Sequence, residues 1–161
     1  MATEFEGEPR GAGVRAAIAI SRFNEELTLR LLEGALMAMQ DHHVEDHNLT
    51  VAWVPGAFEL PLMASTLAKS GNYDAIVCLG VVIKGETTHF DHISAQAAAG
   101  IAAVSRETGI PVSFGVQTTY TLQQAIDRSG GVLGNRGYDA TVAALAMVDA
   151  LKQVRRETEP A

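Results

Sequence analysis

Nine consecutive residues, from Ala75 to Ile83, carry no charged or strongly polar side chain, and the run ends abruptly at Lys84 and Gly85. An apolar run of this length that is rich in β-branched residues and bounded by turn residues predicts a buried strand. Similar but shorter runs predict three further strands, at residues 14–21, 50–54 and 110–116.

Helical patterns separate these strands. Asn24 is the predicted N-cap of a first helix, because Glu25 and Glu26 follow it in the first turn. The apolar stripe of that helix is Leu27, Leu31, Leu32, Ala35, Leu36 and Met39. Later helices are predicted at residues 61–69, around Ile93, Ala97, Ile101 and Val104, and at residues 121–128 and 138–156.

Four strands that alternate with helices predict an α/β three-layer sandwich. Its four-stranded parallel sheet, of flavodoxin-like order, is expected to carry helices on both faces. Residues 1–13 contain several Gly and Pro residues and predict a flexible N-terminal arm, which leaves residues 14–161 as a single domain.

Charge and composition exclude several classes of function. The formal net charge of −7, without a compensating basic patch, argues against binding to nucleic acid or anionic membranes. No apolar stretch approaches the roughly 20 residues that a membrane span needs, and the acidic N-terminus has no signal-peptide pattern. We therefore expect a cytoplasmic protein. Its 47% apolar content suggests surface buried between subunits, and Cys78 is expected to be a buried structural thiol.

The turn after residues 75–83 is the strongest candidate for a functional site. In a parallel α/β sheet, ligands bind beyond the carboxyl ends of the strands. Gly85 allows the backbone to approach a ligand, and the following helix offers free N–H groups to an anion. His89, at the start of that helix, is suited to proton transfer near neutral pH.

The other strand ends carry candidates with two readings each. Phe23 either stacks on a planar heterocycle or serves as a staple at a helix entry. Glu59, after Gly56, either binds hydroxyls and amines or complements a helix dipole. Phe114 is either a second aromatic ring at the ligand, beside that of Phe23, or a core residue. Arg128 is either a phosphate ligand or a solvated side chain.

Other catalytic and cofactor motifs are weak or missing. His89 and His92 lie three residues apart, but no third metal ligand has suitable spacing, so no metal is expected. The sequence has no Gly-x-Ser-x-Gly elbow for a Ser-His-Asp triad, and no glycine-rich phosphate loop of the GxGxxG or GxxxxGK[ST] type.

Taken together, these segments resemble the lumazine synthase family from about Val14 to Leu151. The matching runs are Ser-Arg-Phe-Asn at residues 21–24, Val-Pro-Gly-Ala-Phe-Glu at 54–59, the glycine-histidine segment at 80–90, Pro-Val-x-Phe-Gly-x-x-Thr-Thr at 111–119, and Gln-Ala-Ile-Asp-Arg at 124–128. Several independent motifs in the right order make the resemblance specific.

The resemblance implies a cofactor-free, transferase-type synthase of riboflavin biosynthesis. It would condense 5-amino-6-(D-ribitylamino)uracil with 3,4-dihydroxy-2-butanone 4-phosphate to 6,7-dimethyl-8-ribityllumazine, releasing phosphate and water. His89 would transfer protons. The ribitylaminouracil would contact Phe23, Ala57, Phe58, Glu59, Val81, Val82, Ile83 and, from an adjacent subunit, Phe114. The butanone phosphate would contact Gly85, Glu86, Thr87 and Arg128.

The resemblance also bears on assembly. Family members form homopentamers, some of which assemble into an icosahedral 60-subunit shell, and riboflavin synthase is a possible further partner. The turn at residues 130–137 has no insertion relative to shell-forming members, which favours a shell. Two departures stand out: Val132 replaces a common lysine and removes a positive charge near the phosphate side, and Ser94 replaces a common cysteine.

Two other functions compete with the synthase. A flavin- or lumazine-binding protein, or a shell protein, would keep the fold without catalysis, although it would not need a proton-transferring His89. A metal-dependent hydrolase using His89 and His92 would be sensitive to chelators.

Overall fold

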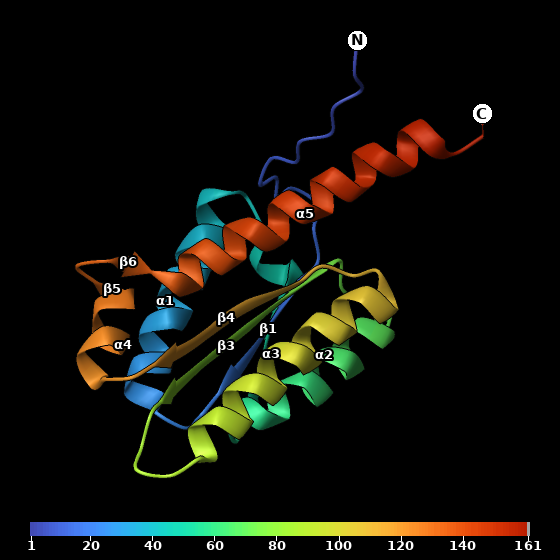
Figure 1. Ribbon diagram of the computed structural model, residues 1–161. Coiled ribbons are helices and arrows are strands. Elements are labelled where there is room, and N and C mark those ends of the chain that lie inside the picture. Colours follow the sequence, from blue (N-terminus) through green and yellow to red (C-terminus); the bar gives the residue numbers. More distant parts are fainter. Residues whose placement is uncertain (161) are drawn as a thin grey trace.

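The computed structural model describes residues 1–160 and shows a four-stranded parallel sheet between two layers of helices (Figure 1). The strands are β1 (Ala16–Ser21), β2 (Leu49–Val54), β3 (Ala75–Ile83) and β4 (Val112–Thr119), in the order β2-β1-β3-β4. The main helices are α1 (Glu25–Asp41), α2 (Leu60–Lys69), α3 (His89–Thr108), α4 (Leu122–Arg128) and α5 (Arg136–Thr158). The predicted three-layer α/β fold is confirmed.

The strand β1 shows how the sheet joins the two layers. Its larger side chains, Ile18 and Ile20, belong to the core under α1 and α5, whereas Ala17 and Ala19 belong to the core under α2 and α3. All four residues are fully buried. Because successive side chains of a strand point to opposite faces, each face of this central strand meets a different helix pair.

Helices α2 and α3 approach each other closely. A Cβ atom added at Gly100, in α3, would lie 2.6 Å from the Pro61 Cγ atom in α2. Any larger residue at position 100 would therefore collide with the first turn of α2, so glycine permits the observed separation of the two helices.

Several element boundaries differ from the sequence prediction by one to three residues. The strand β4 continues to Thr119 instead of ending at residue 116, and Ile83 is the partner of Thr119 in the register with β3. Helix α5 begins at Arg136, two residues earlier than predicted, because the Asn135 side chain accepts hydrogen bonds from the backbone N–H groups of Gly137 and Tyr138. Between α4 and α5, a small hairpin of β5 (Ser129–Gly131) and β6 (Gly134–Asn135) was not predicted.

Residues of the N-terminal arm lie beside α5, near the two chain ends (Figure 1). The Glu8 N–H donates a hydrogen bond of 2.9 Å to Asp149, and the Gln153 side chain bonds both the N–H and the carbonyl of Glu6. The predicted boundary between the arm and a single domain at residue 13 stays a prediction.

Cys78 is fully buried in β3, as predicted, and burial raises the pKa of its thiol to about 12. A thiol that holds its proton this strongly is a poor nucleophile, so its role is packing. Among residues 1–160, the longer helices all fall short of the length and apolarity that crossing a membrane requires.

The amino end of the sheet is held by an ion pair between Arg15 and Asp74. The Arg15 N–H and guanidinium donate to the Asp74 carboxylate at 2.9 and 3.0 Å, joining the residue before β1 to the residue before β3. Partial burial of this carboxyl opposes its ionisation, but the hydrogen bonds from Arg15 outweigh that effect and lower the pKa of Asp74.

We expect Asp74→Asn to lower the free energy of unfolding by about 1 kcal/mol at neutral pH, a value that allows for solvent screening. Because the pKa of Asp74 is lower in the folded state, its contribution is complete above the carboxyl's ordinary pKa and disappears as the pH falls through the folded-state pKa. Urea unfolding at pH values near 7 and near 3 measures both effects. Glu26→Gln, in a largely exposed pair with Arg30, is the control and should change little. An equal loss at both pH values would contradict this assignment.

Candidate active site

A cavity of about 590 Å³ lies at the carboxyl edge of the sheet, on the side covered by α2 and α3. Three chain segments form its walls: the turn after β1, the connection from β2 to α2, and the end of β3 with the start of α3. Ten predicted site residues line it, namely Phe23, Ala57, Phe58, Glu59, Val81, Val82, Ile83, Gly85, Thr87 and His89.

The connection from β2 to α2 forms a short 3-10 helix, η2 (Ala57–Glu59). Ala57 and Leu60 are buried in the core under α2 and α3, whereas Phe58 and Glu59 between them are exposed. The two apolar anchors thus fix the segment on the sheet while an aromatic ring and a carboxylate remain accessible. Because these two residues also line the cavity, η2 can offer stacking and hydrogen-bond acceptance to one ligand.

Phe23 lies on a tight turn that is tied to both neighbouring strands. Its N–H donates to the Pro55 carbonyl at 3.0 Å, and the next residue, Asn24, has a positive φ of 60°. The Asn24 Nδ2 atom donates a 2.9 Å hydrogen bond to the Val81 carbonyl of β3. Phe23 is 71% exposed although its backbone is fixed, so its ring is accessible for stacking on a ligand.

Asn24 precedes α1 at the predicted N-cap position, but its side chain does not act as the cap, because it makes no capping hydrogen bond. The amide instead spans 57 residues of sequence to β3, and a left-handed backbone conformation of this kind is tolerated by asparagine better than by most residues.

The turn after β3 carries the polar part of the cavity. Val81 and Val82 are buried, and every residue from Lys84 to His89 is exposed. His89 is the first residue of α3, and its N–H donates to Thr87 Oγ1 at 3.4 Å. Among residues 1–160, Glu59 and His89 are the only ionisable residues that line the cavity, and the other lining residues are apolar or neutral. This pairing fits acid–base chemistry on a ligand that apolar side chains and backbone groups otherwise hold.

Four residues that line the cavity were not predicted as site residues: Pro55, Gly56, Phe90 and Ile93. Ile93 was interpreted as part of the core stripe of its helix, and it is half-buried. Spacing in the sequence is the signal that identifies Phe90 and Ile93, because they lie one and four residues after His89 in the first turns of the same helix.

Three predicted site residues do not line this cavity. Glu86 lies on the exposed turn beside it. Arg128 is the last residue of α4, half-buried, and its Nη1 atom donates to the Gln124 carbonyl at 3.0 Å. Phe114 lies in β4, which is an edge strand of the sheet. One copy of the chain therefore does not bring all the predicted residues together.

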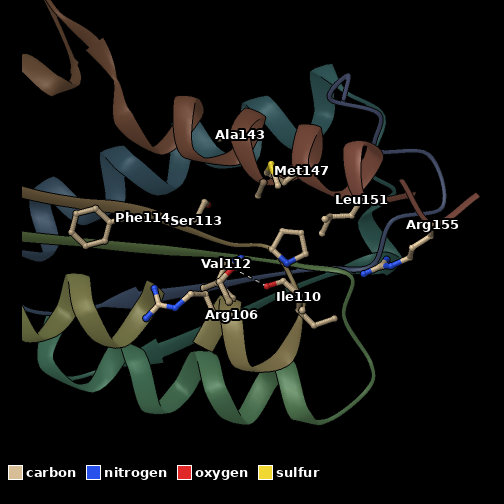
Figure 2. Close-up of a pocket in the computed structure, with 13 residues that line it drawn as sticks. Arg106, Ile110, Val112, Ser113, Phe114, Ala143, Met147, Leu151 and Arg155 are labelled. Carbon is tan, nitrogen blue, oxygen red and sulfur yellow. Dashed lines mark hydrogen bonds between the residues drawn. The ribbon is translucent and has the colours of Figure 1, made fainter. Parts of the chain in front are cut away.

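Phe114 lies at one end of a second, apolar hollow of about 510 Å³. Figure 2 shows its side chain beside Ser113, at the opposite end from Leu151 and Arg155. The hollow runs along β4 between α3 and α5, with Met147 on its α5 side and Arg106 on its α3 side (Figure 2). It is thus separate from the cavity that contains His89.

His92 lies outside the first cavity, although it shares the first turn of α3 with His89. Within residues 1–160, no three His, Cys, Asp or Glu side chains are grouped closely enough to hold a metal ion.

Residues 13–152 of the 161-residue chain match the family described as 6,7-dimethyl-8-ribityllumazine synthase. The chain belongs to the lumazine synthase family. The resemblance found in the sequence motifs is therefore confirmed. Members of the family form the lumazine of riboflavin biosynthesis, and the chain is a transferase-type synthase of that route. Lumazine synthases typically form oligomers.

Proposed function

We propose that the chain condenses 5-amino-6-(D-ribitylamino)uracil with 3,4-dihydroxy-2-butanone 4-phosphate to give 6,7-dimethyl-8-ribityllumazine, with release of phosphate and water. The observation that carries this proposal is the convergence of Phe23, Glu59 and His89 on one cavity, in a chain of the lumazine synthase family. The reaction needs no cofactor, because amine addition, elimination and ring closure require proton transfer and positioning.

The ribitylaminouracil is assigned to the apolar walls of the cavity. The exposed ring of Phe23 stacks on the pyrimidine, and Val81, Val82 and Ile83 present backbone groups to its edge. Ala57 and Phe58 line the opposite wall. The exposed carboxylate of Glu59 accepts hydrogen bonds from ribityl hydroxyls. The accessibility of both Phe23 and Glu59 supports this arrangement.

The butanone phosphate is assigned to the polar turn before α3. Gly85, Glu86 and Thr87 surround the phosphate, and the first N–H groups of α3 favour an anion there. Arg128 is its counter-ion. Because Arg128 and Phe114 do not line the cavity of their own subunit, we assign both to a neighbouring copy.

His89 lies between the two substrate regions and moves the protons. The 5-amino group of the uracil attacks the butanone carbonyl, and loss of one water gives an imine. Phosphate then leaves with the electron pair of its C–O bond as a proton is removed from carbon. Ring closure by the ribitylamino nitrogen releases a second water. Each step adds or removes a proton, which a histidine can do near neutral pH.

The assembly that completes this site is a homo-oligomer, and we propose a cytoplasmic pentamer. The apolar hollow along the edge strand β4 supports a subunit contact there. Phe114 lines this hollow and not the His89 cavity of its own chain, so in this proposal it completes the cavity of a neighbouring subunit. The uninserted turn around the β5–β6 hairpin favours assembly of pentamers into a 60-subunit shell, with riboflavin synthase as a possible partner.

The direct test mixes the purified protein with both substrates and follows lumazine fluorescence. We expect formation well above the spontaneous condensation, without added metal and without inhibition by a chelator. A folded protein that gives no acceleration would overturn the proposal. Riboflavin binding without turnover would instead identify a non-catalytic binding protein, and loss of activity on chelation would indicate a metal-dependent enzyme.

A further inference from the structure

The ring of Tyr120 contacts both ends of the turn that leads to His89. Tyr120 follows β4, and its ring centroid lies 6.2 Å from that of Phe90, with the planes tilted by 43°. Lys84 Nζ lies 5.4 Å from the centroid of the same Tyr120 ring. Both distances are within the ranges of favourable aromatic and cation–π contacts. Lys84 and Phe90 bracket residues 85–89, which include His89.

Residues 85–87 of the bracketed turn have few other supports, whereas the Thr88 carbonyl accepts hydrogen bonds from the N–H groups of Asp91 and His92 at the start of α3. The residues of the turn are exposed, and a Cβ atom at Gly85 would meet no other atom within 4 Å. The Lys84 N–H donates to the Thr119 carbonyl at 2.8 Å, which extends the pairing of β3 with β4, but this bond ends just where the turn begins. Within the turn, the hydrogen bond from His89 N–H to Thr87 Oγ1 is long, at 3.4 Å. The position of the turn therefore depends strongly on the contacts at its two ends.

Tyr120 is itself well anchored. Its N–H donates to Gln124 Oε1 at 2.9 Å, and Gln124 forms a capping box with Thr121 at the start of α4. The Thr119 side chain also donates to the Thr121 carbonyl at 3.0 Å. The ring is thus attached to a fixed helix start, although 68% of Tyr120 is exposed. An exposed ring that contacts two site segments contributes little to the core.

We propose that Tyr120 is a positioning residue of the active site, whose ring holds Lys84 and Phe90 and thereby fixes His89 relative to the bound substrates. The expected effect on catalysis rests on the proposed function. Tyr120 acts through Lys84 and Phe90 and does not itself touch substrate. A small displacement of a proton-transferring group is costly, because the reaction depends on the geometry of bound reactants.

The test compares Tyr120→Leu with Tyr120→Phe in the full chain. Leucine removes the ring, and we expect kcat to fall about fivefold while KM for each substrate changes less than about twofold. Phenylalanine keeps the ring and should restore the wild-type kcat. Leu122→Ala, which removes exposed apolar surface from the same junction, is the matched control and should leave kcat and the unfolding temperature unchanged.

Amide hydrogen exchange gives a readout that does not depend on activity. Tyr120→Leu should accelerate exchange in residues 84–90 by about fivefold, and Tyr120→Phe should not. An unchanged kcat in Tyr120→Leu, with or without faster exchange, overturns the proposal, as does a fall that phenylalanine does not restore. If the wild-type chain fails to accelerate condensation, the proposed function is wrong, and unchanged exchange in Tyr120→Leu would then overturn the positioning role as well.

Discussion

Replacing His89 by alanine is expected to lower kcat for lumazine formation by about 100-fold, the effect typical of losing a general acid–base group. Of the two ionisable residues that line the cavity among residues 1–160, Glu59 is assigned to ribityl hydroxyls, so we expect no other lining residue to replace His89 in proton transfer. KM for either substrate should change little, because His89 acts on bonds that form and break. Steady-state fluorescence kinetics with each substrate varied in turn measures both parameters.

His92→Ala is the matched control for this experiment. His92 is exposed in the same first turn of α3 but does not line the cavity, so its loss should leave kcat unchanged. Because His89 is exposed as well, neither substitution should alter the unfolding temperature. Equal losses in the two variants, or wild-type turnover in His89→Ala, would show that proton transfer has been assigned to the wrong group.

Replacing Arg128 by alanine is expected to raise KM for the butanone phosphate by about 30-fold, with KM for the ribitylaminouracil unchanged. A charge-assisted hydrogen bond to phosphate contributes about 2 kcal/mol, and removal of the guanidinium eliminates both the charge and its planar donors. Val132 stands where the family commonly has a lysine, so it offers no charge to replace the lost one. Inhibition by inorganic phosphate should weaken in parallel.

Two variants separate phosphate binding from general effects of charge. Arg128→Lys keeps the positive charge but not the planar donors, so its KM for the butanone phosphate should lie between those of wild type and Arg128→Ala. Arg30→Ala removes an equal charge from the exposed surface of α1 and should not change KM for either substrate. The assignment fails if Arg30→Ala and Arg128→Ala behave alike, or if Arg128→Ala affects the uracil substrate instead. Since Arg128 also bonds Gln124, the unfolding temperature of Arg128→Ala must be measured.

Strand boundaries were predictable where side-chain chemistry changes abruptly. The bounds of β3 match the apolar run because Lys84 and Gly85 end it sharply. The end of β4 was missed because Gln117 and Thr119 are polar, although both are buried beside β3. The role of Asn24 was missed for a different reason. A local capping pattern looks the same in sequence whether the amide bonds its own helix or a strand far along the chain.

The candidate site was predictable to the extent that it follows from the sheet. Phe23, Glu59 and His89 all follow carboxyl ends of parallel strands, so the fold brings them to one edge. Phe114 is different, because it lies within β4 at the sheet edge and faces a separate hollow. A contact between subunits leaves no periodic signal in one chain, and only the resemblance to a family indicated that Phe114 would come from a neighbouring copy.

The close contact between Gly100 and Pro61 joins the two helices that adjoin the cavity. Glu59 immediately precedes α2, and His89 begins α3, so the two ionisable residues that line the cavity stand at the starts of these two helices. A single methyl group at position 100 would push the helices apart without touching either functional side chain. Position 100 thus acts on the helices that begin beside the cavity, although Gly100 itself does not line it.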